Sequence, residues 1–270
     1  MRSESEVSRL ECDVLLVGAG IMSATVATLL KELDPTLHIE VFERLDRVAG
    51  ESSDASNNAG TGHAALCELN YTSLKSDGTV DISKALKVME SFEVSKQFWA
   101  WLAERNAVAE ETLIRAVPHI SFVTGEEDVA FLKKRHAALT ASHLFEGMEY
   151  TESPDELAAW MPLMMQGREP SEPMAATRSL LGTDVNFGAL TRGLFTHLKR
   201  AFGVEVWLEH AVHSLKQLDD KRWLAEVNDR ALGLSREVCA KFVFIGAGGG
   251  ALELLDDSGI EEGAGYGGFP

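Results

Sequence analysis

The chain has 270 residues, enough to bury one large core or two smaller ones. Its composition is that of a globular protein, with 45% apolar and 25% charged residues. The 42 acidic side chains outnumber the 25 basic ones, giving a net charge of −17. This charge argues against nucleic acid as a partner and against tight binding to anionic lipid headgroups.

No targeting or membrane-spanning segment is evident in the sequence. No apolar run reaches the roughly 18 residues of a transmembrane helix, and the polar first residues contain no signal-peptide core. We therefore expect a cytoplasmic protein. The cysteines Cys12, Cys67 and Cys239 are never spaced as CxxC, which favours a reducing compartment and predicts no metal site.

The first structural unit is predicted to be a strand, a glycine turn and a helix. The apolar residues 14–17 precede Gly18 and Gly20, and an Ala- and Leu-rich run continues to about residue 34. Such a turn lets the backbone pass close to a pyrophosphate, whose charge then lies against free N–H groups at the helix start. Ser23 takes the third position of the fingerprint, and its side chain is small enough for close packing of the helix on the strand.

A second strand is predicted over residues 37–42, and it delivers Glu43 to its carboxyl end. Glu43 follows the glycine turn by roughly 20 residues, the spacing at which an acidic side chain accepts hydrogen bonds from a ribose diol. The acid would repel a 2′-phosphate, so NADP is disfavoured and the adenosine end of FAD or NAD is expected. Strand, turn, helix and acid together predict a dinucleotide site, which a glycine turn alone does not.

The middle of the chain is predicted to be mainly helical. Residues 50–62 are rich in glycine and asparagine and too polar for a core. Apolar positions then recur at three- and four-residue steps, which predicts an amphipathic helix over about 81–105. An alternating strand over 119–124 and a helix over 126–141 follow.

Capping residues mark the next two helices. Ser153, with proline after it, is predicted to cap a short helix by a capping box. We interpret residues 161–183, with three prolines and several methionines, as irregular chain. Asn186 is predicted to cap a helix over 188–202, which ends at a glycine.

Three strands at hairpin spacing then predict a meander, at 204–208, 211–215 and 223–227. A buried strand over 242–245 is followed by Gly246, Gly248 and a short helix. This second junction of strand, glycine and helix would bring another stretch of backbone to the ligand-binding edge of an open parallel sheet.

The order of these elements resembles two-domain FAD oxidoreductases of the D-amino-acid-oxidase type. More specifically, four segments are similar to malate:quinone oxidoreductases: VGAGIMSATVATLL, VFERLDRVAGESSDASNNAGTGHAAL with CELNYT, PHISFV, and GTDVNFGALT. They spread over nearly the whole chain, and the NNAGTGHAALCELNYT block is long and specific. Members of this family run much further than Pro270, and the glycine-rich last residues supply no closing strand, so we expect this chain to be incomplete.

The resemblance implies an α/β fold with two domains. Residues 1–80 and 185–270 would form an FAD-binding, Rossmann-like parallel sheet with a β-meander, and residues 81–184 an inserted, incomplete α+β substrate domain. It implies a peripheral flavoenzyme on the cytoplasmic face of the membrane, which oxidises (S)-malate to oxaloacetate in the tricarboxylic acid cycle. FAD would take the hydride and pass the electrons to a membrane quinone.

The resemblance also assigns cofactor contacts. The expected residues are Gly18, Gly20, Ser23, Glu43, Arg44, Ser53, Asn57, Gly60, Thr61, Gly62, Val212, Gly246 and Gly248. Glu43 and Arg44 would face the adenosine, and Val212 in the meander the adenine. The segment 52–62 would run along the cofactor toward the isoalloxazine.

His63 and Arg178 are the candidates for the chemistry itself. The reaction needs a base to take the hydroxyl proton while hydride leaves the neighbouring carbon, and histidine titrates in the right range. The alternative for His63 is a hydrogen bond to flavin or backbone. Arginine suits the carboxylates of malate, although Arg178 can equally be interpreted as a solvated surface residue.

Three other functions stay open at this point. Another flavin enzyme of the same layout, such as an L-2-hydroxyglutarate or amino-acid dehydrogenase, would share the opening unit. An NAD-dependent enzyme is disfavoured by the second glycine junction and by the segment 50–62. A truncated flavin-binding module without catalysis is the third alternative.

Overall fold

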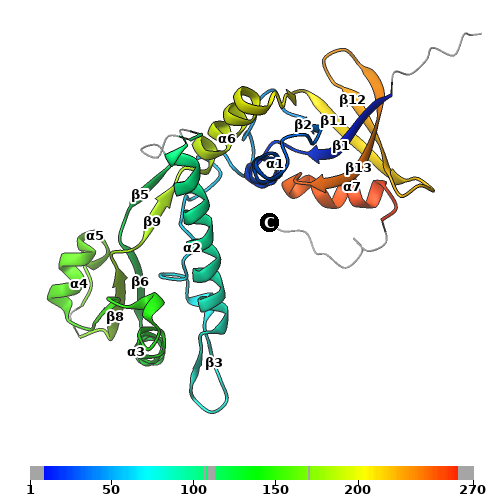
Figure 1. Cartoon of the computed structure of the whole chain (residues 1–270). Helices are drawn as coiled ribbons and strands as arrows, with labels where there is room; N and C mark the ends of the chain where they lie inside the picture. The colour runs from blue at the N-terminus through cyan, green and yellow to red at the C-terminus, as the bar shows by residue number, and fades with distance from the viewer. Residues whose placement is uncertain (1–8, 106, 109–112, 170, 261–270) are drawn as a thin grey trace, which may run out of the picture. The chain divides into compact units, whose positions relative to one another are not determined.

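The computed structural model describes residues 9–105, 107–108, 113–169 and 171–260 (Figure 1). The chain divides into two compact units. Unit 1 consists of Met1–Ala59, Arg105–Leu113 and Asn186–Pro270, and unit 2 of Gly60–Glu104 and Ile114–Val185. Unit 2 thus begins at Gly60, earlier than the limit of 81 placed from the sequence, and residues 261–270, where we expected no closing strand, lie outside the described chain.

Unit 1 is built on a six-stranded sheet of order β10-β2-β1-β13-β12-β11. Its strands are β1 (Leu10–Val17), β2 (Ile39–Phe42), β10 (Val206–Trp207), β11 (His210–Gln217), β12 (Trp223–Asp229) and β13 (Leu234–Ile245). β1 pairs in parallel with β2 and β13, whereas β11, β12 and β13 form an antiparallel meander. The predicted parallel sheet with a meander is therefore confirmed.

β13 belongs to both halves of this sheet. Its segment 234–240 pairs with β12 in antiparallel register, and its segment 238–245 pairs with β1 in parallel register. The predicted strand over 242–245 is confirmed as the end of a longer strand that begins at Leu234, but it is not buried as expected, since Phe242 is exposed. The first predicted strand of the meander was wrong, since Val206–Trp207 pair in parallel with β2.

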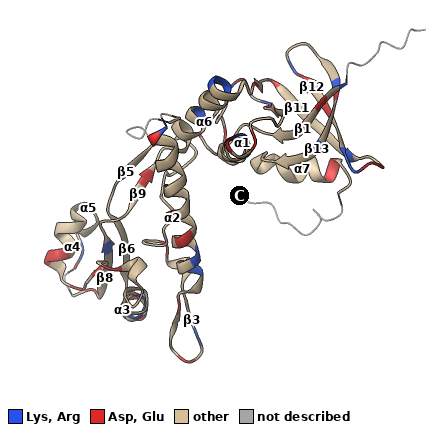
Figure 2. Ribbon diagram, in the orientation of Figure 1, with Lys and Arg blue, Asp and Glu red and all other residues tan. Residues whose placement is uncertain are grey.

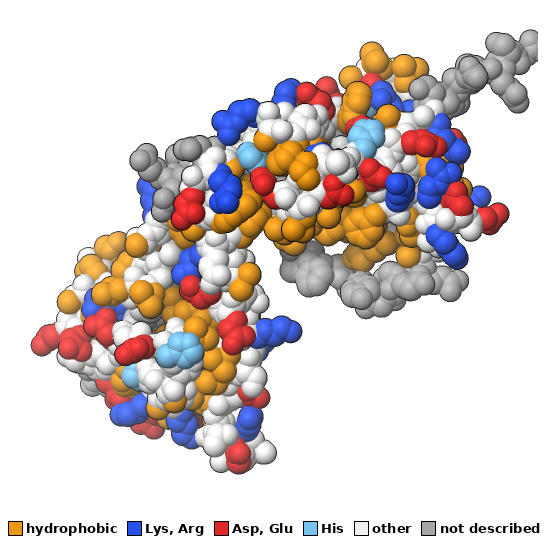
Figure 3. All heavy atoms as spheres, in the orientation of Figure 1, with side chains coloured by type: hydrophobic (Ala, Val, Ile, Leu, Met, Phe, Trp, Pro, Cys, Tyr) orange, Lys and Arg blue, Asp and Glu red, His pale blue; other side chains and the backbone are white. Residues whose placement is uncertain are grey.

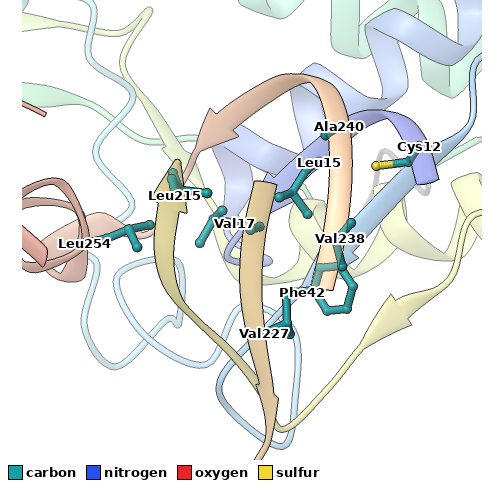
Figure 4. Close-up of a cluster of buried hydrophobic side chains, with 10 residues drawn as sticks. Cys12, Leu15, Val17, Phe42, Leu215, Val227, Val238, Ala240 and Leu254 are labelled. Carbon is teal, nitrogen blue, oxygen red and sulfur yellow. The ribbon is translucent and has the colours of Figure 1, made fainter. Parts of the chain in front are cut away.

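Helices and an apolar core complete unit 1. The helices are α1 (Ile21–Leu33), α6 (Phe187–Phe202) and α7 (Ala251–Asp257), with a 3-10 turn at Gly248–Gly250. Figure 4 shows the core, in which Leu15, Val17 and Phe42 meet side chains of the meander and Leu254 of α7. The predicted cap of α6 is confirmed, since the side chain of Asn186 accepts a 2.9 Å hydrogen bond from the N–H of Ala189.

Unit 2 holds a three-stranded sheet of order β6-β8-β7 and two short ribbons. Its strands are β3 (Ser73–Leu74), β4 (Val80–Asp81), β5 (Ile114–Ala116), β6 (His119–Thr124), β7 (Glu149–Thr151), β8 (Met174–Ser179) and β9 (Thr183–Val185). Its helices are α2 (Ser83–Glu104), α3 (Glu126–Thr140), α4 (Pro154–Trp160) and α5 (Pro162–Met165), with 3-10 turns at Leu69–Tyr71 and His143–Phe145.

Two local predictions in unit 2 were wrong. Residues 161–183 are not irregular, because β8 is the central strand of the sheet and all of its residues except Arg178 are buried. α4 begins at Pro154, but the side chain of Ser153 makes no capping hydrogen bond. Ser153 is connected to the preceding strand through its backbone, because its N–H donates to Oγ1 of Thr151 at 3.0 Å.

Candidate functional site

The main candidate site is a cavity in unit 1 at the ends of β1, β2 and β13. It has a volume of about 720 Å³ and is lined by these strand ends, the start of α1, residues 49–53 and part of β11. Ligand cavities in proteins typically measure roughly 300–1,000 Å³. The cavity lies at the carboxyl edge of the parallel strands, where open α/β sheets bind ligands.

The glycine turn forms one wall of this cavity. Gly18 has a φ of +91°, and a Cβ added to it would lie 2.6 Å from the carbonyl oxygen of Gly246. Gly20 is the N-cap of α1, whose first turn contains no acidic residue. The N–H of Ile21 donates to Oγ of Ser53 at 3.0 Å. The backbone N–H groups at the N-terminus of α1 and the positive end of its helix dipole therefore favour the binding of an anion there.

Glu43 directly follows β2, contacts the glycine turn and is 8% exposed. Its Oε2 accepts from the N–H of Ala19 at 2.6 Å, and its Oε1 accepts from the N–H of Leu45 at 2.9 Å. Each carboxylate oxygen can accept a further hydrogen bond. The carboxylate is thus fixed by backbone amides at the cavity wall and has acceptor capacity left for a pair of hydroxyl groups.

Of the other expected cofactor residues in unit 1, five more line the cavity: Arg44, Ser53, Val212, Gly246 and Gly248. Ser23 does not line it, because this side chain is completely buried under the turn and packs against Gly246. Asn57 does not line it either, and its side-chain amide donates to the carbonyl of Glu51 at 3.3 Å.

Residues of the meander that were not expected from the sequence also line the cavity. Asn228 and Arg230, at and just after the end of β12, line the cavity, and Nη1 of Arg230 donates to the carbonyl of Arg44 at 3.0 Å. His210 and His213 on β11 line it as well. In the sequence, these residues could be recognised only by their position near the predicted strand ends. The register of the meander, which the sequence does not show, brings them to the cavity.

The expected flavin-proximal glycines belong to unit 2. The carbonyl of Gly60 accepts from the N–H of Val185 at 2.6 Å, and the N–H of Gly62 donates to the carbonyl of Thr183 at 2.9 Å. Thr61, between them, forms a bridge with Asp184. These three residues pair with the segment around β9 and lie in a different unit from the cavity of Gly18.

His63 follows this pairing and has a neighbouring carboxylate. Its side chain is 62% exposed, and its Nδ1 lies 3.5 Å from Oε1 of Glu68. Arg135 of α3 is completely buried behind the same turn. It donates from Nη2 to the carbonyls of Ala65 and Glu68 at 3.0 and 3.3 Å, and from Nε to Oγ1 of Thr72 at 3.2 Å.

Arg178 is engaged in an ion pair. Its Nε and Nη2 donate to the two carboxylate oxygens of Glu149 at 2.6 and 3.0 Å, and its guanidinium lies 4.2 Å from the ring centre of Trp160. The pair holds the pKa of Glu149 below its usual range and raises the pKa of Arg178. A bidentate partner leaves Arg178 less able to receive a substrate carboxylate.

The ribbon in Figure 2 shows acidic and basic residues interspersed along both units, and the face drawn in Figure 3 mixes charged with apolar side chains. Within the described ranges, no three His, Cys, Asp or Glu side chains are grouped so that they could hold a metal ion. No helix of the described chain combines the length and the apolar character needed to cross a membrane.

Comparison with known sequences identifies similar proteins along almost the whole chain. The family model described as malate:quinone oxidoreductase matches residues 10–270. A probable malate:quinone oxidoreductase of Geobacillus kaustophilus is 58% identical over 96% of this chain and 52% of the relative. A probable malate:quinone oxidoreductase 1 of Pseudomonas aeruginosa is 56% identical over 96% of this chain and 50% of the relative. The chain thus spans about half the length of these relatives.

Solved structures share the fold at low sequence identity. A glycine oxidase from Geobacillus kaustophilus matches with a TM-score of 0.67 and 17% identity, covering 92% of this chain and 58% of the oxidase. An L-α-glycerophosphate oxidase from Mycoplasma pneumoniae, solved with FAD bound, matches with a TM-score of 0.66 and 16% identity, covering 92% and 57%. The α/β fold predicted from the sequence is therefore also that of known oxidases.

Proposed function

We propose, since this chain belongs to the malate:quinone oxidoreductase family, that it binds FAD in the cavity of unit 1 and takes part in the oxidation of (S)-malate to oxaloacetate. The electrons would pass to a membrane quinone, and the reaction would serve the tricarboxylic acid cycle. The observation that carries the proposal is the cavity at the start of α1, with its glycine turn and its amide-bound Glu43, in a chain of this family.

The residues around the cavity fit the adenosine diphosphate part of FAD. The backbone at Gly18 and Gly20 would receive the diphosphate at the N-terminus of α1, where the helix dipole favours negative charge. Glu43 would accept hydrogen bonds from the ribose hydroxyls, and Val212 on β11 would contact the adenine. Bound FAD would supply the hydride acceptor for the oxidation.

His63 is proposed as the base that takes the hydroxyl proton of malate. Its ring is exposed, so a substrate can reach it. It directly follows residues 60–62, which pair with residues 183–185 and belong to the segment that resembles the family. Proton transfer from the hydroxyl while hydride leaves the adjacent carbon gives a neutral ketone product and avoids a charged alkoxide. Gly60, Thr61 and Gly62 are proposed to lie along the flavin.

Contact with a membrane is proposed to be peripheral and on the cytoplasmic face. A quinone partitions into the bilayer, so an enzyme that reduces it must reach the membrane surface. The net charge of −17 argues that this contact uses apolar side chains and not a broad basic patch on anionic lipid.

A visible absorption spectrum tests the proposal. The purified chain should show flavin bands that bleach anaerobically when (S)-malate is added and do not bleach with (R)-malate. Bleaching by L-2-hydroxyglutarate or an amino acid, and not by malate, would transfer the activity to a related flavin enzyme. Absence of flavin bands after reconstitution with FAD would contradict the proposed cofactor.

The role of His63 has a separate test. His63→Ala should retain flavin and slow its reduction by malate by about 100-fold, the typical effect of losing a general base. His143→Ala, a histidine of a 3-10 turn in the same unit, is the control and should reduce at the parent rate. A His63→Ala protein that is reduced as fast as the parent removes His63 from the chemistry.

A further inference from the structure

The turn that follows His63 has a backbone conformation that needs an explanation. Ala65 is completely buried and has a φ of +56°, a left-handed conformation that a residue with a Cβ rarely adopts. The N–H of Ala64 donates to the carbonyl of Gly62 at 2.7 Å, which tightens the turn further. Such strain persists only where the surrounding structure fixes the backbone, and it is concentrated at functional sites.

Arg135 is the group that fixes this turn. It comes from α3, and its three hydrogen bonds go to Ala65, Glu68 and Thr72, spread across the turn. Burial lowers the pKa of Arg135 to about 10, so the side chain still carries its charge at neutral pH. A planar guanidinium can hold several acceptors at fixed angles, which an ammonium cannot.

Arg135 also holds the backbone of Glu68, whose side chain lies beside His63. Its carbonyl is bonded by Arg135, and its side-chain Oε1 lies 3.5 Å from Nδ1 of His63. Both carboxylate oxygens are buried, and among the described residues the thiol of Cys67 is the hydrogen-bonding side chain that interacts with this carboxylate. Nη1 of Arg135 is likewise buried without an acceptor among those residues. Cys67 and Tyr71 are the other titratable groups that interact with Glu68.

A carboxylate at Nδ1 selects one tautomer of a neutral histidine. The negative carboxylate, 3.5 Å from Nδ1, attracts the proton to that nitrogen, and Nε2 then keeps a free lone pair. Serine hydrolases use a buried aspartate in this way to orient the histidine that acts as base.

We propose that Glu68 and Arg135 are positioning residues for His63. Arg135 fixes the strained turn, the turn places the carboxylate of Glu68 against Nδ1, and Nε2 of His63 is left free to accept a proton. The inference rests on the proposed function for its meaning in malate oxidation, because the proton accepted at Nε2 is the malate hydroxyl proton. The orientation of the ring itself does not depend on malate.

Nitrogen NMR of the histidine side chains in the flavin-loaded protein tests the orientation directly. The His63 signals are assigned by their loss in His63→Gln, and spectra are recorded at a pH where the ring is neutral. We expect the Nδ1–H tautomer in the parent protein. We expect a shift to the Nε2–H tautomer in Glu68→Leu, which removes the negative charge beside Nδ1, and in Arg135→Lys, which keeps the charge and loses the planar fork.

Two controls separate positioning from general stability. Lys133→Gln removes a cation of α3 that pairs with Glu152 on the surface, and it should leave the His63 tautomer unchanged. Glu68→Leu tests the carboxylate even if Arg135→Lys fails to fold. A parent protein with the Nε2–H tautomer, or a tautomer that stays the same in folded Glu68→Leu, would overturn the proposal.

Reduction of the flavin by malate gives a second readout. Glu68→Leu should slow reduction by about tenfold or more in the parent and have no further effect in the His63→Ala background, because it acts through His63. Equal effects in both backgrounds would contradict the proposal. If malate reduces the flavin neither in the parent protein nor in any variant, the proposed function is wrong. The tautomer measurement still decides the role of Glu68 in that case.

Discussion

The two compact units form their candidate sites by different means. In unit 1 the cavity wall includes a backbone turn, with a glycine at a φ of +91° and amides that hold Glu43. In unit 2 the turn after His63 is held by a side chain that comes from 70 residues further along the chain than Ala65. A site formed by the backbone of residues close together in sequence can be recognised from a short motif. A site formed by side chains far apart in sequence is assembled only when the helices and strands that carry them pack together.

This difference predicts opposite sensitivities to mutation. Around the cavity, added atoms should do more damage than lost ones, since the backbone itself occupies the close contacts. Around the turn of unit 2, removal of a side chain should do more damage, because buried partners are left without hydrogen bonds.

The largest effect is expected for Gly18→Ala. The new Cβ would clash with the carbonyl of Gly246, and φ would be strained as well, so we expect at least about 2 kcal/mol of lost stability and no retained flavin. Chemical denaturation and the ratio of flavin to protein absorbance measure both. Gly233→Ala is the matched control, with a φ of +67° and no atom within 4 Å of the added Cβ. Equal losses in the two variants would refute a role for close approach.

Glu43→Gln should have the next largest effect. An amide group facing the N–H of Ala19 or Leu45 leaves one buried donor without an acceptor, which costs about 1–3 kcal/mol. Flavin titration should show about tenfold weaker binding. Glu226→Gln, on β12 and exposed, provides the control and should bind flavin like the parent. Unchanged affinity in Glu43→Gln would show that ribose is not held there.

Arg178→Gln should leave the reaction with malate unchanged. Its guanidinium is committed to Glu149, so we expect a KM for malate within about twofold of the parent value and a slightly lower thermal midpoint. Glu149→Gln should lower the midpoint similarly, since it removes the same ion pair. If the KM for malate rises strongly in Arg178→Gln and not in Glu149→Gln, Arg178 binds the substrate after all.

The smallest effect concerns acid pH. Because Arg178 lowers the folded-state pKa of Glu149, the stabilisation is complete only when the pH is well above the unfolded-state pKa of 4.5. It is lost as the pH falls through the lowered folded-state pKa. Thermal midpoints of Glu149→Gln and the parent should therefore converge on acidification. A difference that persists at low pH would mean that the contribution is packing and not charge.

Predictions based on local sequence succeeded where the determining contacts are local. The turn between β1 and α1, the place of Glu43 directly after β2, the Asn186 cap and the family resemblance depend on neighbouring residues or on contiguous segments. The family, the fold and the cap are confirmed, whereas the cofactor roles of the turn and of Glu43 stay predictions. β8 was missed because its buried, small residues lie among prolines and methionines, where no periodicity marks a strand. The ion pair of Arg178 could not be inferred, since its partner lies 29 residues away on another strand.

The order of the strands has a consequence during synthesis. β1 leaves the ribosome early, but its parallel neighbour β13 follows roughly 220 residues later. At about 5–20 residues per second, the first strand waits roughly 10–45 seconds for this partner. The edge of β1 that faces β13 thus stays without its strand partner for that interval, whereas β2, which pairs with Val14–Val17 on the other edge, follows β1 directly.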